Sequence, residues 1–168
     1  MNPFEFFGIP ESILPDQKKI RQKYLSIQMG EHPDFGSDGQ LSEKANEYYA
    51  ILKSDILRVK CILQINGTVN INENVLNSDF LMEMMEISDE IEIGISGNET
   101  SLNSAIKSIN NQMDALKQEL IDIDNQVNNN HWSIKNFSTE ITGRLNSWFQ
   151  RYKYLSRLEK NANGIQEI

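Results

Sequence analysis

Residues 102–127 read LNSAIKSINNQMDALKQELIDIDNQV, with large apolar side chains at alternating steps of four and three. The pattern runs without a break through Leu102, Ile106, Ile109, Met113, Leu116, Leu120, Ile123 and Val127. A sustained heptad of this kind is typical of a helix that packs against other helices with a left-handed crossing. The stretch therefore predicts one long helix with a continuous apolar seam.

Two further helical segments flank this helix. Residues 78–93 precede it and end at the breaker-rich sequence GISGN, whereas residues 134–155 follow it. The later segment keeps the same apolar spacing through Ile134, Phe137, Ile141, Leu145, Trp148, Tyr152 and Leu155. Three helices with matching apolar stripes predict a three-helix bundle over residues 78–168. The polar, Asn-rich residues 68–77 are expected to be a linker.

Residues 1–67 predict a second helical unit. The opening MNPFEFFGIP indicates a short apolar helix or turn. Pro15 and Asp16 then provide a helix start, and the helix is expected to end near Gly30. A second long helix is expected over residues 41–65, so the two helices should pack as an antiparallel hairpin. The expected fold class is all-α, with an N-terminal helical hairpin and a C-terminal three-helix bundle.

The distribution of charge narrows the possible partners. The formal net charge of −8 divides into −1 over residues 1–67, −10 over residues 68–130 and +3 over residues 131–168. Nucleic acid is not an expected partner, because it requires an extended basic surface. No apolar run approaches the ~20 residues that cross a bilayer, and the start of the chain lacks the basic and apolar regions of a secretory signal. We therefore expect a cytoplasmic protein that does not engage a membrane.

The sequence offers no catalytic or metal-binding constellation. A single cysteine, Cys61, excludes an internal disulfide and a CxxC metal site. His131 follows an Asn-rich turn without other ligand residues nearby in sequence. The acidic run from Glu83 to Glu92 lacks the glycine of a calcium-binding loop and falls on an expected helix. We expect no cofactor and no metal, and we expect that the chain is not an enzyme.

The tripeptide His32-Pro33-Asp34 lies in the Gly- and Asp-rich stretch EHPDFGSDG between the two expected N-terminal helices. Three residues alone have little specificity, since loops often contain Pro and Asp. The placement is more informative, because the preceding helix carries Lys and Arg away from its apolar stripe. This arrangement resembles a J-domain, which uses an HPD loop and a basic helix to dock on a DnaK-class ATPase.

The resemblance extends to one family of J-domain proteins, the HscB-type co-chaperones of iron–sulfur cluster assembly. The opening NPFEFFGIP and the stretch ANEYYAILKSDILRVKCILQINGTVN are similar to the first and third J-domain helices of that family. Outside the J-domain, SDFLMEMMEISDEIE and RYKYLSRLEKN are similar to segments of its C-terminal bundle. Only the heptad helix between them matches by pattern alone.

The resemblance implies two protein-binding sites. His32, Pro33 and Asp34 would stimulate ATP hydrolysis by a DnaK/HscA-type chaperone. Lys19, Arg21 and Lys23 would steer that encounter. An IscU-type iron–sulfur scaffold protein would bind a surface of the bundle made of Leu81, Met82, Met85, Glu86, Asp89, Glu90, Lys153 and Tyr154.

Two departures from the family pattern qualify these expectations. Phe35 and Gly36 follow the tripeptide where the family usually has a basic residue, which could weaken ATPase coupling. The paired CxxC motifs of a zinc module, which eukaryotic members often carry at the N-terminus, do not occur in this chain. Two alternatives stay open: a J-domain co-chaperone with a different client, or a structural helical bundle in which the HPD string has no function.

Overall fold

The computed structural model describes residues 1–30, 40–67, 76–131 and 133–164 of the 168-residue chain. These residues form seven α-helices and no strand, which confirms the all-α class. Internal contacts divide the chain into two compact units, Met1–Val69 with Ile123–Thr142, and Asn70–Asp122 with Gly143–Ile168. Among the helices that the structure describes, none has both the length and the apolar character of a membrane span.

The first unit opens with two helices whose starts are fixed by side-chain caps. Helix α1 spans Pro3–Phe7, and its start is closed reciprocally: the Asn2 side chain accepts from the Glu5 amide while the Glu5 carboxylate accepts from the Asn2 amide. Helix α2 spans Gln17–Gly30, and Asp16 Oδ1 accepts from the backbone amide of Lys18 at 2.9 Å. The start expected at Asp16 is thus confirmed, and its cause is the satisfaction of free first-turn amides.

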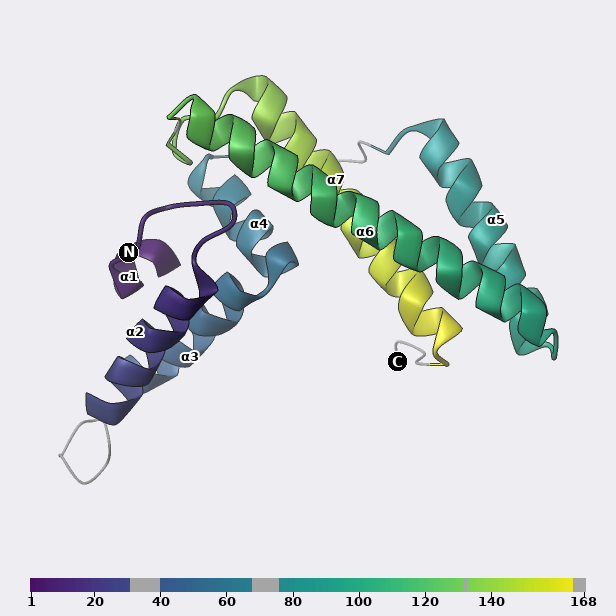
Figure 1. Ribbon diagram of the computed structural model, residues 1–168, viewed down its shortest axis with the longest axis horizontal. Coiled ribbons are helices and arrows are strands. Elements are labelled where there is room, and N and C mark those ends of the chain that lie inside the picture. The colour runs from purple at the N-terminus through teal and green to yellow at the C-terminus, as the bar shows by residue number, and fades with distance from the viewer. Residues whose placement is uncertain (31–39, 68–75, 132, 165–168) are drawn as a thin grey trace. The chain divides into compact units, whose positions relative to one another are not determined.

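Helices α2 and α3 (Gln40–Lys53) run side by side in the first unit (Figure 1). The rings of Tyr24 and Tyr49 stack with centroids 4.3 Å apart, and Tyr24 Oη donates to Asn46 Oδ1 at 2.8 Å. Ile20 of α2 and Leu52 of α3 are fully buried. These contacts confirm the expected N-terminal helical hairpin.

The single helix expected over residues 41–65 is wrong, because the structure divides it in two. Helix α4 begins at Asp55 and ends at Ile65, and Ser54 separates it from α3. Ser54 is extended and its side chain caps the new helix, accepting from the Leu57 amide. The carbonyl oxygen of Leu52 is used instead by two side chains, Arg58 and Gln17. The break is therefore stabilised by a cap on one side and by side-chain donors on the other.

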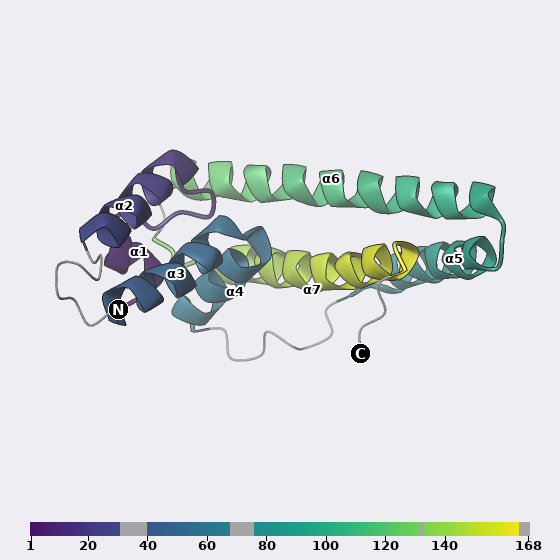
Figure 2. The same cartoon turned by 90° about the horizontal axis from the view of Figure 1, so that it is seen from below.

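The second unit contains most of three helices: α5 (Ser78–Ile95), α6 (Glu99–Asn129) and α7 (Thr139–Ala162). Helices α6 and α7 lie alongside each other in both views (Figures 1 and 2), and Trp148 Nε1 donates to the Leu116 carbonyl oxygen at 2.7 Å. Gln112 of α6 donates to Glu83 of α5, and Phe80 of α5 meets Tyr154 of α7 edge to face. The expected three-helix bundle is confirmed.

Apolar side chains from all three helices form the core of this bundle. Buried members include Phe80, Met84, Ile87 and Ile91 of α5, Ala105, Ile109, Leu116 and Leu120 of α6, and Leu145, Trp148, Phe149, Leu155 and Leu158 of α7. The turn between α5 and α6 depends on a glycine: a Cβ on Gly94 would lie 2.6 Å from Leu102 Cβ and 2.8 Å from its Cα. Only a residue without a side chain allows the two helices to approach so closely there.

One expected helix boundary differs from the structure. Helix α7 begins at Thr139 and not at Ile134, because Ser138 Oγ accepts from the Ile141 amide and caps the helix. By their internal contacts, residues 123–142 group with Met1–Val69. Contacts made by Asn66 illustrate the reason, since its side chain accepts from the Phe137 amide and donates to Thr142 Oγ1.

Candidate functional site

The tripeptide His32-Pro33-Asp34 lies outside the residues that the structure describes. The part of the candidate chaperone-binding site that the structure describes is helix α2, which precedes the tripeptide in the chain. Lys19, Arg21 and Lys23 are all exposed there. Their side chains are thus available for an encounter with an acidic partner.

The structure does not bring these three cations together on one face of α2. Lys19 and Lys23 are four residues apart and neighbours on the helix surface, whereas Arg21 points about 160° away around the axis. Arg21 lines an open groove between α2 and α3, together with Lys18, Tyr49 and Lys53. Lys19 instead lines a separate hollow with Ile9, Pro10 and Asp16. Lys18 and Lys53 were not among the expected binding residues, although helical spacing places Lys18 near Arg21.

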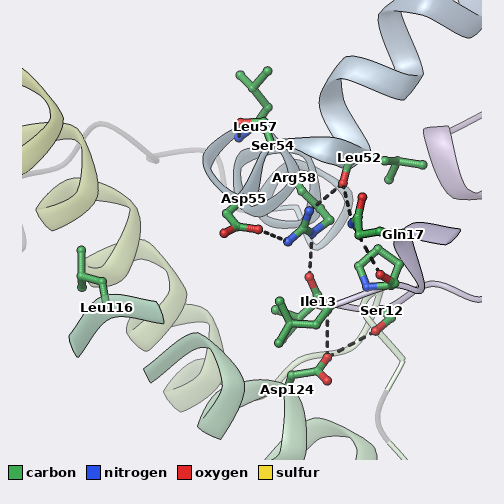
Figure 3. A network of polar contacts seen from close by, with 12 residues as sticks. Ser12, Ile13, Gln17, Leu52, Ser54, Asp55, Leu57, Arg58, Leu116 and Asp124 are labelled. Atoms are coloured by element: carbon green, nitrogen blue, oxygen red, sulfur yellow. Dashed lines mark hydrogen bonds and ion pairs between the residues drawn. The ribbon is translucent and has the colours of Figure 1, made fainter. Parts of the chain in front are cut away.

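A buried arginine is among the residues that line the Arg21 groove, and Figure 3 shows its polar contacts. Arg58 of α4 is 1% exposed, and its guanidinium donates to the carbonyl oxygens of Ile13 at 2.7 Å and Leu52 at 2.6 Å. It also forms an ion pair with Asp55 at the first turn of the same helix. Since a buried guanidinium requires this many acceptors, Arg58 fixes the segment between α1 and α2 against the start of α4.

A second buried side chain holds the same segment from the other side. Asp124 of α6 accepts from Ser12 Oγ at 3.3 Å (Figure 3) and from the Leu14 amide at 3.0 Å. It also accepts from Asn128 Nδ2 at 2.9 Å. The residues that precede α2 are thus bonded to two helices of the first unit. Sequence reasoning did not assign these roles to Arg58 and Asp124; a charged residue within an apolar helical stripe was the available signal.

The candidate scaffold-binding surface begins on α5. Met82 and Met85 are 57% and 63% exposed, whereas the neighbouring Met84 is fully buried. Glu86 and Asp89 are exposed on the same helix. The core positions of α5 are already filled by other apolar residues, so the two exposed methionines do not serve the bundle interior. They form an adaptable apolar surface flanked by acids.

The remaining expected members of that surface differ in how far they are exposed. Leu81 is half-buried, and the half-buried Glu90 accepts a hydrogen bond from Ser104 of α6 at 3.3 Å. On α7, Lys153 is exposed and the guanidinium of Arg157 lies 4.7 Å from the centre of the Tyr154 ring. Because Tyr154 also meets Phe80, it lies beside the start of α5.

The described residues offer little for metal or thiol chemistry. Within residues 1–30, 40–67, 76–131 and 133–164, no three His, Cys, Asp or Glu side chains gather as metal ligands would. Cys61 is half-buried in α4, and burial raises the pKa of its thiol. A raised pKa favours the unreactive protonated form at neutral pH.

Comparison with known proteins gives a consistent result over nearly the whole chain. A co-chaperone protein HscB homologue from Haemophilus ducreyi is 31% identical over 99% of this chain and 96% of its own length. An HscB homologue from Vibrio vulnificus is 29% identical over 99% of this chain and 98% of its own. No protein-family model matches the chain.

Two solved structures share the fold. Chaperone HscB from Vibrio cholerae aligns with a TM-score of 0.67 at 21% identity, over 98% of this chain and 97% of that one. Human co-chaperone protein HscB aligns with a TM-score of 0.71 at 18% identity, over 97% of this chain and 81% of that one. Fold and sequence together define a J-domain-type co-chaperone. Within that class, the chain belongs to the HscB co-chaperone family.

Proposed function

We propose that this co-chaperone stimulates the ATPase of a DnaK/HscA-type chaperone and delivers an IscU-type iron–sulfur scaffold protein to it in the cytoplasm. Residues 1–67 would act as the J-domain, residues 68–77 as a linker and residues 78–168 as the scaffold-binding bundle. The chain would act through these two protein contacts and not as an enzyme. Membership of the HscB family supports the proposal.

One observation supports the client site more than any other: Met82 and Met85 are exposed on a helix whose inward positions are filled. An exposed apolar stripe on an otherwise well-packed helix typically presents a surface to a partner. Acidic neighbours on α5 would add charge complementarity to a basic partner surface. The bundle thus has the composition expected of a protein-binding module.

Calorimetric titration of the full chain with a purified IscU-type scaffold tests the client site. Met82→Ala combined with Met85→Ala should weaken binding by about a hundredfold, since an interface anchor commonly contributes 1–2 kcal/mol. The melting temperature should change little, because both side chains are exposed. Met29→Ala, which removes an exposed methionine from α2, should leave scaffold affinity unchanged. A well-folded double variant that still bound the scaffold normally would contradict the proposed site.

The chaperone half is tested through His32. His32→Gln should abolish ATPase stimulation of a purified DnaK-class partner while leaving the melting curve and the scaffold affinity unchanged. Full stimulation by this variant would remove the proposed J-domain function. Stimulation without any scaffold binding by the wild-type chain would point instead to a J-domain co-chaperone with another client.

A further inference from the structure

An asparagine that precedes a glycine can lose its side-chain amide without an enzyme, and the chain contains two such pairs, Asn66 with Gly67 and Asn163 with Gly164. The backbone nitrogen of the glycine attacks Cγ of the asparagine, and ammonia leaves from Cγ as a cyclic succinimide forms. Water then opens the ring at either carbonyl carbon, which gives aspartate or isoaspartate. Glycine favours the attack, because it has no side chain to hinder its nitrogen.

The backbone is closely similar at the two pairs. Gly67 and Gly164 are both exposed and both have a positive φ, +79° and +72°. The nitrogen of each donates to the carbonyl oxygen three residues earlier, at 3.0 Å for Gly67 and 3.1 Å for Gly164. A Cβ added to either glycine would meet no atom within 4 Å. The two attacking nitrogens are therefore equally accessible and are held by the same kind of bond.

The side chains of the two asparagines differ in their partners. Asn66 Oδ1 accepts from the Phe137 amide at 3.0 Å, and Asn66 Nδ2 donates to Thr142 Oγ1 at 2.9 Å. Asn163 is exposed, and its side chain forms no hydrogen bond within the part of the chain that the structure describes. Cγ of Asn66 is thus held in place from both sides, whereas Cγ of Asn163 can turn toward the next backbone nitrogen.

We propose that Asn163 is a site of spontaneous deamidation in the folded chain, and that the fold protects Asn66 from the same reaction. Asn66 has to break two side-chain hydrogen bonds before its Cγ can reach the nitrogen of the next residue. The net strength of two such bonds slows the reaction by about tenfold or more. Asn163 has no such bond to break, so it reacts at the rate that its backbone allows.

Deamidation of Asn163 adds a negative charge directly after Ala162, the last residue of α7. The carbonyl oxygens at the end of a helix already carry partial negative charge, so the added carboxylate destabilises the last turn. The candidate scaffold-binding residues Lys153 and Tyr154 lie more than two turns earlier in the same helix. The reaction thus marks older copies of the chain at the end of α7, and it does not depend on either proposed protein partner.

Peptide mass spectrometry of the full chain, incubated at mildly alkaline pH, measures how fast each asparagine is lost. In the folded chain, Asn163 should be lost about tenfold or more faster than Asn66. In guanidinium chloride, where no native hydrogen bond protects either pair, the two should be lost at similar rates. Isoaspartate should accumulate at position 163, because direct hydrolysis of the side-chain amide gives only aspartate.

Two substitutions test the cause of the difference. Thr142→Val removes one hydrogen-bond partner of Asn66 and should speed its loss by about fivefold, with the rate at Asn163 unchanged. Gly164→Ala places a methyl group beside the attacking nitrogen and should slow the loss of Asn163 without changing that of Asn66. Thermal melts check that both variants stay folded. Equal rates at the two asparagines of the folded wild-type chain, an absence of isoaspartate at position 163, or rates that neither substitution changes would overturn the proposal.

Discussion

Arg58 Nε donates to the carbonyl oxygen of Ile13 at 2.7 Å from a side chain that is almost entirely buried. The bond joins α4 to the segment that leads into α2, across 45 residues of sequence. Together with the Leu52 carbonyl and the Asp55 carboxylate, it satisfies most of the guanidinium donors. The position of the helix that carries the candidate docking cations thus depends in part on one side chain from α4.

Loss of this side chain should destabilise the first unit. Arg58→Met should lower the free energy of unfolding by about 2–4 kcal/mol, because the Ile13 carbonyl oxygen loses its side-chain donor and the Leu52 carbonyl oxygen keeps only the bond from Gln17. Lys60→Met, at an exposed position of the same helix, should change it by no more than ~0.5 kcal/mol. Urea denaturation measures both values, and equal small effects would show that the network contributes little.

Gly94 near the end of α5 and Gly143 of α7 form a matched pair for alanine substitution, because a Cβ would be crowded at the first and free at the second. Gly94→Ala should destabilise the chain by about 1–3 kcal/mol, because its Cβ would overlap the backbone of Leu102. Gly143→Ala meets no atom within 4 Å and should stabilise by about 0.4–1 kcal/mol, since alanine restricts the unfolded chain. Chemical denaturation of the two variants should give opposite signs. If both variants were stabilised, the α5–α6 turn would be able to shift and accommodate the added methyl group.

Acidification should remove a contribution made by Glu5. The hydrogen bond from the Asn2 amide, followed by the hydrogen bond from Lys135 Nζ at 3.2 Å, lowers the pKa of Glu5 in the folded chain. This contribution is fully present above the ordinary Glu value of about 4.3 and is lost as pH falls through the lower folded-state pKa. Wild type should therefore melt at a higher temperature than Glu5→Gln near neutral pH. The difference between the two melting temperatures should disappear at acidic pH.

Lys135 should account for part of that difference. Its own pKa is raised, first by the hydrogen bond to Glu5 and then by the charge of Glu11. Its contribution is present below the ordinary Lys value of about 10.4 and is lost as pH rises through the higher folded-state pKa. In a Lys135→Met background, the Glu5→Gln difference should shrink but not vanish, because the Asn2 bond is retained. An unchanged difference would show that the ion pair adds nothing.

The division of the α2 cations predicts unequal effects on chaperone docking. Lys18→Ala with Arg21→Ala should slow association more than Lys19→Ala with Lys23→Ala, because Lys53 adds its charge to the groove of the first pair. The difference should diminish as salt screens charges beyond about 8 Å. Stopped-flow association with a DnaK-class chaperone at several ionic strengths measures it. Equal slowing by both pairs would favour steering by net charge alone.

Periodicity predicted most of the helices, but it did not predict the break at Ser54 in the helix expected over residues 41–65. Leu52, Ile56, Val59 and Leu63 keep helical spacing on both sides of Ser54, so the apolar pattern passes through the break unchanged. The local signal was the pair Ser54 and Asp55, a cap followed by a first-turn acid. Ile134 and Phe137 likewise kept the spacing of α7 although they precede its start, because apolar residues next to a helix can be buried without belonging to it.

The candidate surfaces were predicted as sets of residues and not as faces. The expected binding residues included Met82 and Met85 but not Met84, and in the structure Met84 fills the core whereas Met82 and Met85 are exposed. Helical spacing alone separates Arg21 from Lys19 and Lys23, although the resemblance assigned all three to one site. The roles assigned to His32, Pro33 and Asp34, and the division into J-domain, linker and bundle, stay predictions.

The burial of Trp148 makes the bundle observable by fluorescence. Its indole is hydrogen-bonded to Leu116 and stacked on Tyr152, in surroundings that exclude water. An indole in such surroundings emits at shorter wavelength than one in water. Since the chain has two tryptophans, Trp132→Phe would leave Trp148 as a single emitter. Its red shift would then follow the melting of the scaffold-binding bundle, and circular dichroism would show whether the first unit melts with it.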